Sequence, residues 1–172
     1  MADAKVKERF SASQIARRID ELANEIRADA GDTEIMLIGI LKGTAVFMAD
    51  LLRAIPGQVQ FEYIDVVREI SDTEIAAAME IDFMMHFDMR GKNVYLLKDV
   101  VSTGVIENYL LTQFRMRTPA NLKLVALLDR PDLRTMELEV DFRAFQATNG
   151  TFVGYGLELR GQYANLAYIG SI

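Results

Sequence analysis

Three short polar segments of this sequence hold the residues best suited to binding a charged ligand. They are Lys42-Gly43-Thr44, residues 98–104, and Asp129-Arg130, and each lies at the end of a run of apolar residues. In the second segment, Ser102-Thr103-Gly104 offers hydroxyl and backbone N–H groups that suit a phosphate, helped by the dipole of a following helix. The alternative interpretation of this tripeptide is a capped turn between a strand and a helix.

The other polar residues of these segments also have two interpretations each. Gly43 could bring the backbone close to a ligand, or it could form a plain turn before a helix. Asp99 could accept ligand hydroxyls or hold a metal ion through water, or it could pair with Lys98 beside it. His86, the only histidine, lies in a stretch rich in Met and Phe, which favours a half-buried side chain over a catalytic one.

The composition of the chain excludes several classes of site. Its 172 residues contain no cysteine, which rules out disulfides, cysteine metal sites and cysteine nucleophiles. A single histidine cannot build a multi-histidine metal site. Neither GxxxxGK[ST] nor GxGxxG occurs, so a P-loop nucleotide triphosphatase is excluded. The net charge of -6 argues against a nucleic-acid partner, whose phosphates attract basic surfaces.

The distribution of apolar residues predicts a cytoplasmic protein with no membrane contact. The longest apolar runs are far shorter than the ~20 residues of a membrane-spanning helix. The opening decapeptide MADAKVKERF has no apolar core of the kind found in signal peptides. Residues 1–172 contain no linker-like stretch or repeat, so we expect a single domain.

The first half of the chain predicts helix, buried strand, helix and strand. Ser11 or Ser13 can cap a helix that ends at Gly31-Asp32. Residues 35–41 are apolar without alternation, as in a strand buried on both faces, and residues 59–67 favour another strand. The expected inward residues of the first helix are Ile15, Ile19, Leu22 and Ile26. Those of the helix between the strands, which stops at Pro56-Gly57, are Val46, Phe47, Leu51 and Ile55.

The second half of the chain repeats this alternation after an ambiguous stretch. Residues 68–78 are compatible with helix or loop, and the alternation in residues 79–85 indicates a strand. Residues 94–97 and 122–128 are further buried runs, with a helix between them. The expected inward residues of that helix are Ile106, Tyr109, Leu110 and Phe114. The remaining expectations are short strands at 137–142 and 152–155 and an irregular tail at 163–172.

This alternation of helices and buried strands is typical of an α/β domain with a mostly parallel sheet. In such sheets, ligands bind outside the carboxyl ends of the strands. Because all three polar segments follow or end predicted strands, we expect them to lie around one crevice.

Five separated motifs carry a family resemblance. They are residues 38–43, 94–104, 127–131, 153–158 and 168–170. Together they resemble the hypoxanthine(-guanine) phosphoribosyltransferases, which are type I phosphoribosyltransferases. The resemblance implies a mostly parallel five-stranded sheet flanked by helices, with a small hood built from terminal segments. It also implies transfer of phosphoribosyl from phosphoribosyl pyrophosphate (PRPP) to a purine base, with Mg²⁺, in purine salvage, by a homodimer or homotetramer.

The resemblance also implies which residues bind the ligands. Lys42 and Gly43 would bind pyrophosphate, often through a cis peptide in this family, and Arg130 would recognise the exocyclic oxygen of the purine. The aromatic residue that stacks on the purine in this family falls at Thr151, and Phe152, one position on, would take its place after a shift of register. Glu158 would hold Mg²⁺ if the protein is active. The remaining substrate-binding positions are Asp99, Ser102, Thr103 and Gly104.

The chain departs from the family pattern at several of these positions. The family loop reads Glu-Asp-x-x-Asp-Thr-Gly, and here Lys98 replaces the Glu, which reverses the local charge. Ser102 replaces the Asp that acts as base, and a hydroxyl with no neighbouring base cannot take a proton near neutral pH. Arg68-Glu69 stands where the family's mobile loop has Ser-Tyr, Ile106 where the phosphate cradle has a hydroxyl, and Ala164 where pyrophosphate meets an Arg.

Two hypotheses about function follow. The first is a purine phosphoribosyltransferase with weak or altered activity, in which no residue is assigned as the catalytic base. The alternative is a pseudoenzyme, a non-catalytic protein of this fold that binds a purine nucleotide, a phosphate or a protein partner. A regulatory RNA-binding relative is a third possibility, and the net charge of -6 speaks against it.

Overall fold

A five-stranded parallel sheet forms the centre of the molecule. The computed structural model describes residues 6–66 and 87–172 of the chain. The strands run in the order β3-β2-β4-β5-β6, and every neighbouring pair is parallel. Their bounds are β2 Ile35–Ile40, β3 Val59–Ile64, β4 Asn93–Val101, β5 Asn121–Asp129 and β6 Phe142–Gln146. The α/β class and the five-stranded parallel sheet are therefore confirmed.

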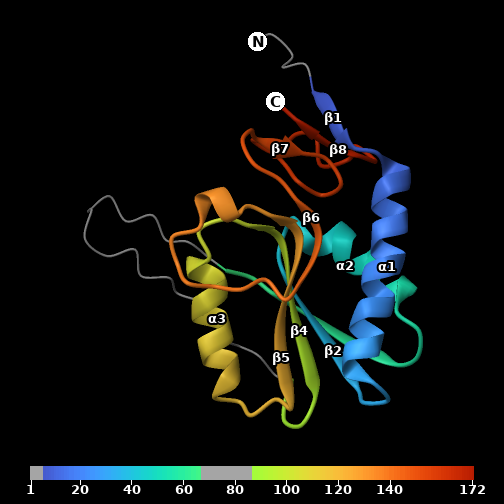
Figure 1. Cartoon of the computed structure of the whole chain (residues 1–172), viewed down its shortest axis with the longest axis vertical. Coiled ribbons are helices and arrows are strands. Elements are labelled where there is room, and N and C mark those ends of the chain that lie inside the picture. The colour runs from blue at the N-terminus through green and yellow to red at the C-terminus, as the bar shows by residue number, and fades with distance from the viewer. Residues whose placement is uncertain (1–5, 67–86) are drawn as a thin grey trace.

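Helices cover both faces of this sheet (Figure 1). α1 (Ala12–Ala30) and α2 (Thr44–Ala54) pack on one face, and α3 (Val105–Arg115) packs on the other. Alternate residues of β4 supply the two cores, with Tyr95 and Leu97 facing α1 and α2. Because both faces are covered, the central strands are apolar throughout, and all six residues of β2 are buried.

The two ends of the chain form a second, smaller sheet. β1 (Lys7–Phe10), β8 (Ile169–Ser171) and β7 (Phe152–Val153) pair antiparallel in the order β1-β8-β7. Figure 1 shows this sheet beyond one end of the central sheet, with the C-terminus beside it. It corresponds to the hood that the family resemblance implies. The irregular tail expected at 163–172 is wrong for β8, and no strand is predicted from the sequence where β1 lies.

The first half of the chain agrees with its sequence pattern, with one exception. Ser11 caps α1 through a capping box with Gln14, and Gly31 ends the helix with a positive φ. All four residues expected on the inner face of α1 are buried. In α2, however, Val46 is 39% exposed and Met48 takes the inward place. Met48 packs there against Gly39, where a Cβ would crowd its terminal methyl.

Three expectations for the second half are wrong. Residues 137–141 form no strand, because Leu138 and Val140 reach the core from an extended loop and pairing with β5 begins only at Phe142. In α3, Leu111 is buried and Tyr109 is 38% exposed. Residues 98–101 belong to β4 rather than to a loop. The expectations for 68–78, 79–85 and His86, and the Arg68-Glu69 substitution, lie outside the described residues.

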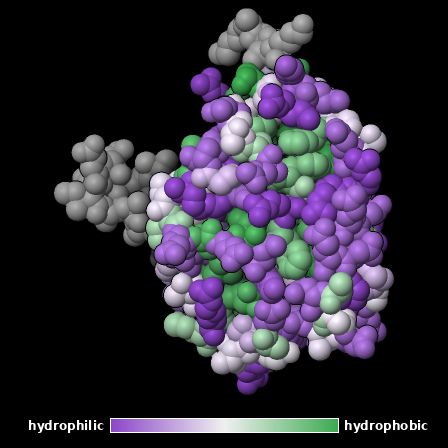
Figure 2. All heavy atoms as spheres, in the orientation of Figure 1, coloured by the Kyte–Doolittle hydropathy of each residue, from purple (hydrophilic) through white to green (hydrophobic). Residues whose placement is uncertain are grey.

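None of the helices in residues 6–66 and 87–172 has the length and apolar character needed to cross a membrane. Figure 2 shows one face of the molecule on which hydrophilic residues predominate and apolar residues form patches between them.

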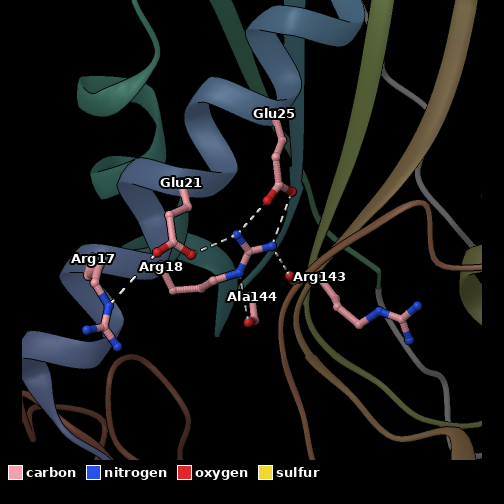
Figure 3. Close-up of polar contacts among 6 residues, drawn as sticks. All are labelled: Arg17, Arg18, Glu21, Glu25, Arg143 and Ala144. Carbon is pink, nitrogen blue, oxygen red and sulfur yellow. Dashed lines mark hydrogen bonds and ion pairs between the residues drawn. The ribbon is translucent and has the colours of Figure 1, made fainter.

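Arg18 ties α1 to the edge strand β6 (Figure 3). Its Nε and Nη2 atoms donate to the backbone carbonyls of Ala144 and Arg143, at 3.2 and 2.8 Å. Glu25 accepts hydrogen bonds from Nη1 and Nη2 of Arg18, and these bonds raise the pKa of the guanidinium. The Arg18 side chain is 21% exposed, whereas that of Glu25 is 44% exposed.

Replacing Arg18 with Ala should reduce the free energy of unfolding by about 1–2 kcal/mol, because two strand carbonyls lose a charged donor. Arg17 is the matched control on the same helix, since its pair with Glu21 is long, at 3.9 Å, and its side chain is 74% exposed. Arg17→Ala should change stability by no more than about 0.5 kcal/mol. Urea unfolding of both variants measures the difference, and equal losses would contradict this role of Arg18.

Candidate active site

The three polar segments lie side by side at the carboxyl edge of the central sheet. β4 is hydrogen-bonded to β2 on one side and to β5 on the other, so the ends of all three strands are neighbours. The backbone N–H of Arg130 donates to the carbonyl of Val101 at 2.9 Å, which joins the end of β5 to the end of β4. The parallel topology therefore gathers these residues as the sequence predicted.

The loop after β2 lies between the end of β4 and the residues that follow β7. The Leu41–Lys42 peptide is cis, as is often the case in the family this chain resembles, and the side chain of Lys42 is exposed. A Cβ on Gly43 would overlap Oδ2 of Asp99, and a Cβ on Gly156 would come within 2.7 Å of the Gly43 carbonyl oxygen. Glycine is thus required at 43 because the Asp99 carboxylate occupies the space of a side chain.

Lys98 and Asp99 form an ion pair at the end of β4. Nζ of Lys98 donates to Oδ1 of Asp99, and both side chains are 17% exposed. Of the two interpretations of Asp99 left open by the sequence, the structure has the pair with Lys98. The carboxylate is in contact on both sides, with the ammonium at Oδ1 and with Gly43 at Oδ2.

The turn from β4 into α3 is covered by the residues that follow β5. Gly104 begins α3 with a φ of 84°, a conformation that favours glycine. The carbonyl of Thr103 accepts hydrogen bonds from the N–H groups of Thr135 and Met136, both at 3.1 Å. A Cβ on Gly104 would lie 3.2 Å from Cδ of Arg134. Within this turn Ser102 is half-buried and Thr103 is exposed.

Two arginines hold the carboxylate at the end of β5. The Asp129 side chain is 3% exposed, and it forms ion pairs with Arg134 at Oδ1 and with Arg143 at Oδ2, the latter at 2.9 Å. Arg134, which is not among the residues predicted from the sequence, follows Asp129 closely across the short 3₁₀ turn Pro131–Leu133.

Arg130 is clamped beside the hood. Its Nε and Nη2 donate to the two oxygens of Asp132 at 3.0 and 2.9 Å, and Nη1 donates to the carbonyl of Gly150 at 3.0 Å. The bonds from Arg130 lower the pKa of Asp132, and the same carboxylate raises the pKa of Arg130. The guanidinium carbon lies 5.4 Å from the ring centroid of Phe152, so these two predicted residues are brought together.

These carboxylates do not fit a resident magnesium ion. Asp99, Asp129 and Asp132 are each paired with a cation of the chain itself. Glu158 is exposed, and among residues 6–66 and 87–172 no three acidic or histidine side chains gather where they could hold a metal. Octahedral Mg²⁺ needs free oxygens at about 2.0–2.1 Å. The role of Glu158 as a metal ligand stays a prediction.

Glu107 is a buried carboxyl group that sequence analysis missed. It lies in the first turn of α3 and is 4% exposed. Burial raises its pKa, while the positive charges of Lys98 and Arg134 act in the opposite direction. Its spacing with Leu110, Leu111 and Phe114 puts an acidic residue on the apolar stripe of the helix, which is the signal that could have revealed it.

Comparison with known proteins agrees with these features. A family model described as phosphoribosyl transferase domain matches residues 6–160. The hypoxanthine-guanine phosphoribosyltransferase of Mycobacterium avium is 36% identical over 169 residues, which cover 95% of this chain and 83% of the relative.

Solved structures of similar proteins share the fold over nearly the whole chain. A hypoxanthine-guanine phosphoribosyltransferase from Bacillus anthracis, crystallised with a HEPES molecule in its active site, has a TM-score of 0.90 at 32% identity and covers 98% of this chain and 99% of its own. The hypoxanthine phosphoribosyl transferase of Trypanosoma cruzi, solved in work on its C-terminal region, oligomeric state and enzymatic activity, has a TM-score of 0.87 at 28% identity. Its match covers 100% of this chain and 94% of that one.

Replacing Glu107 with Gln should stabilise the protein increasingly as the pH rises. Because burial raises the pKa of Glu107 in the folded state, its contribution to stability is fully present below the unfolded-state pKa and is lost as the pH rises through the folded-state pKa. Gln cannot ionise, so the difference in melting temperature should be absent in acid and should favour the variant at neutral pH. The control is Glu139→Gln, at an exposed position. A difference in melting temperature between Glu107→Gln and the wild type that does not vary with pH would contradict the raised pKa of Glu107.

Proposed function

Because the chain belongs to the hypoxanthine-guanine phosphoribosyltransferase family, we propose that it binds PRPP and a purine base at the carboxyl edge of the sheet and transfers phosphoribosyl between them with weak or altered activity. We expect weak or altered activity because Ser102 occupies the position of the base in the family. A serine hydroxyl takes up a proton near neutral pH only with the help of a base.

The neighbouring carboxylates are poorly suited to replace that base. Asp99 is engaged by Lys98, and Asp129 by Arg134 and Arg143. Both oxygens of Asp129 already accept hydrogen bonds from arginine, and Asp99 is held between Lys98 and Gly43, so neither carboxylate is placed to reach a purine nitrogen freely. Chemistry at this edge therefore relies on positioning and on the positive charges, which leaves residual rather than full catalysis.

The arrangement of Arg130 supports recognition of a purine. Asp132 and Gly150 fix the guanidinium in one orientation, and arginine has five donor hydrogens, so donors remain for an exocyclic oxygen. The ring of Phe152 beside it offers an aromatic surface. Thr103 and the backbone at the start of α3 would hold the 5′-phosphate, and Lys42 and Gly43 the pyrophosphate.

The second candidate function is non-catalytic binding of a purine nucleotide, a phosphate or a protein partner at the same place. The Lys98–Asp99 ion pair favours it, because a carboxylate of the family's signature loop is turned to an internal partner. The two candidates differ in whether product forms, while both require the ligand to bind.

The quaternary structure and cellular setting are proposed from the same family. A homodimer or homotetramer is supported by the exposed apolar side chains of Val46 on α2, directly after the Lys42 loop, and Phe61 on the edge strand β3. The family also supports a cytoplasmic protein of purine salvage. Light scattering of the purified chain should give a mass of about two or four times 19.4 kDa. A mass equal to that of the monomer would contradict the proposed homodimer or homotetramer.

Turnover should be at least about 100-fold slower than that of the Mycobacterium avium relative, because positioned general acid–base catalysis typically contributes 10²–10⁴-fold. The assay supplies PRPP, Mg²⁺ and hypoxanthine, guanine or xanthine and measures the nucleotide formed. Calorimetry with inosine 5′-monophosphate tests binding separately. Turnover within tenfold of the relative would contradict the proposed weakness, and binding without any turnover would select the non-catalytic candidate.

The double variant Ser102→Asp, Lys98→Glu should raise turnover by about 10-fold or more, because it supplies a base and frees Asp99. Lys123→Met is the control, since Lys123 forms a similar half-buried pair with Asp29, at 3.1 Å, near the amino end of β5. A folded double variant with unchanged turnover would show that neither residue limits the reaction.

A further inference from the structure

We propose, on the basis of the proposed function, that the ammonium group of Lys98 takes the place of a divalent metal ion in holding PRPP at this site, so that PRPP binds equally well without Mg²⁺. Members of the family generally depend on Mg²⁺, and the family resemblance implies that acidic residues at positions 98 and 99 would meet the ribose hydroxyls and, in part, such an ion. In this chain the positive charge at that place belongs to the protein.

The positive charge next to Asp99 is supplied by a side chain of the protein itself. Nζ of Lys98 forms an ion pair with Oδ1 of Asp99, so the charge of the ammonium lies against the carboxylate that a metal would need. Both side chains are 17% exposed, which shields the pair from bulk water and strengthens it relative to a surface pair. A second cation at the same carboxylate would be repelled by the ammonium.

The other carboxylate oxygen of Asp99, Oδ2, is not accessible to a hydrated ion. Gly43 packs so closely on Oδ2 that a single added methyl group would overlap it. Mg²⁺ demands nearly ideal octahedral geometry and keeps several of its waters, which need room around the ligating oxygen. The backbone of the loop after β2 fills that room.

Lys98 keeps donor hydrogens that could bind a ligand. An ammonium group has three donor hydrogens, and the Asp99 pair uses one of them. Lys98 lies in the second half of β4, which leads into the turn of Ser102 and Thr103, and its neighbour Asp99 contacts the Lys42 loop. Under the proposed function the 5′-phosphate of PRPP would lie at that turn and its pyrophosphate at the loop, and Lys98 lies on the strand that leads into the turn and pairs with β2.

The test compares PRPP binding by isothermal titration calorimetry with Mg²⁺ and with EDTA. For the wild-type chain we expect dissociation constants within about threefold of each other. Lys98→Met should weaken binding in EDTA by about 10-fold or more, the usual effect of losing a charged hydrogen bond. Lys98→Glu should bind PRPP only with Mg²⁺. The control Lys123→Met, at the opposite end of the sheet, should behave like the wild type.

Electron paramagnetic resonance of Mn²⁺ supplies an independent readout. The wild-type chain should leave Mn²⁺ free, and Lys98→Glu should bind it. Wild-type binding of PRPP that requires Mg²⁺, or wild-type binding of Mn²⁺ that Lys98→Glu does not change, would overturn the proposal while leaving the proposed function intact. Failure of PRPP and inosine 5′-monophosphate to bind under either condition would instead overturn the proposed function, and with it the role of Lys98.

Discussion

The parallel pairing of β4 with β2 and β5 is the constraint on which the site depends. It brings the carboxyl ends of three strands to one edge, and the loop or turn that follows each strand must then lie beside the other two. Gly43 can approach Asp99 and Arg130 can bond to Val101 only because the strands end together. Residues of β2 and β4 are buried against α1 and α2 on one face and against α3 on the other, which fixes the strands relative to the helices.

The charges at this edge are balanced within the chain. Lys98 neutralises Asp99, Arg134 and Arg143 neutralise Asp129, and Asp132 holds Arg130. Such pairs gain little if exposed, but here most of the partners are largely buried, and removing one member would leave an unpaired charge. The excess of 25 acidic over 19 basic residues in the whole chain therefore says little about the site. What matters there is that the acidic residues are already occupied.

Much of this could be predicted from sequence because local patterns and strand direction determine it. The unbroken apolar run of β2 and the capped stripe of α1 indicate their structures directly, and parallel topology alone places the polar segments together. The hood could not be derived in this way, because β1 and β8 pair across nearly the full length of the chain and are only a few residues long. Residues 137–141 alternate like a strand, yet their burial comes from packing rather than from pairing.

Pairings between side chains are the other part that sequence patterns do not contain. Nothing in the spacing of Lys98 and Asp99 determines whether neighbours on opposite faces of a strand turn toward each other, and the packing of Gly43 on Asp99 helps to decide it. Because Lys98, Asp99, Glu107 and Arg134 interact in one cluster, the effect of changing one depends on the others. Replacing Lys98 with an acid would remove the cation that is paired with Asp99 and would place a second carboxyl group beside it. The identity of residue 98 thus determines whether the positive charge at this edge comes from the protein or from solution.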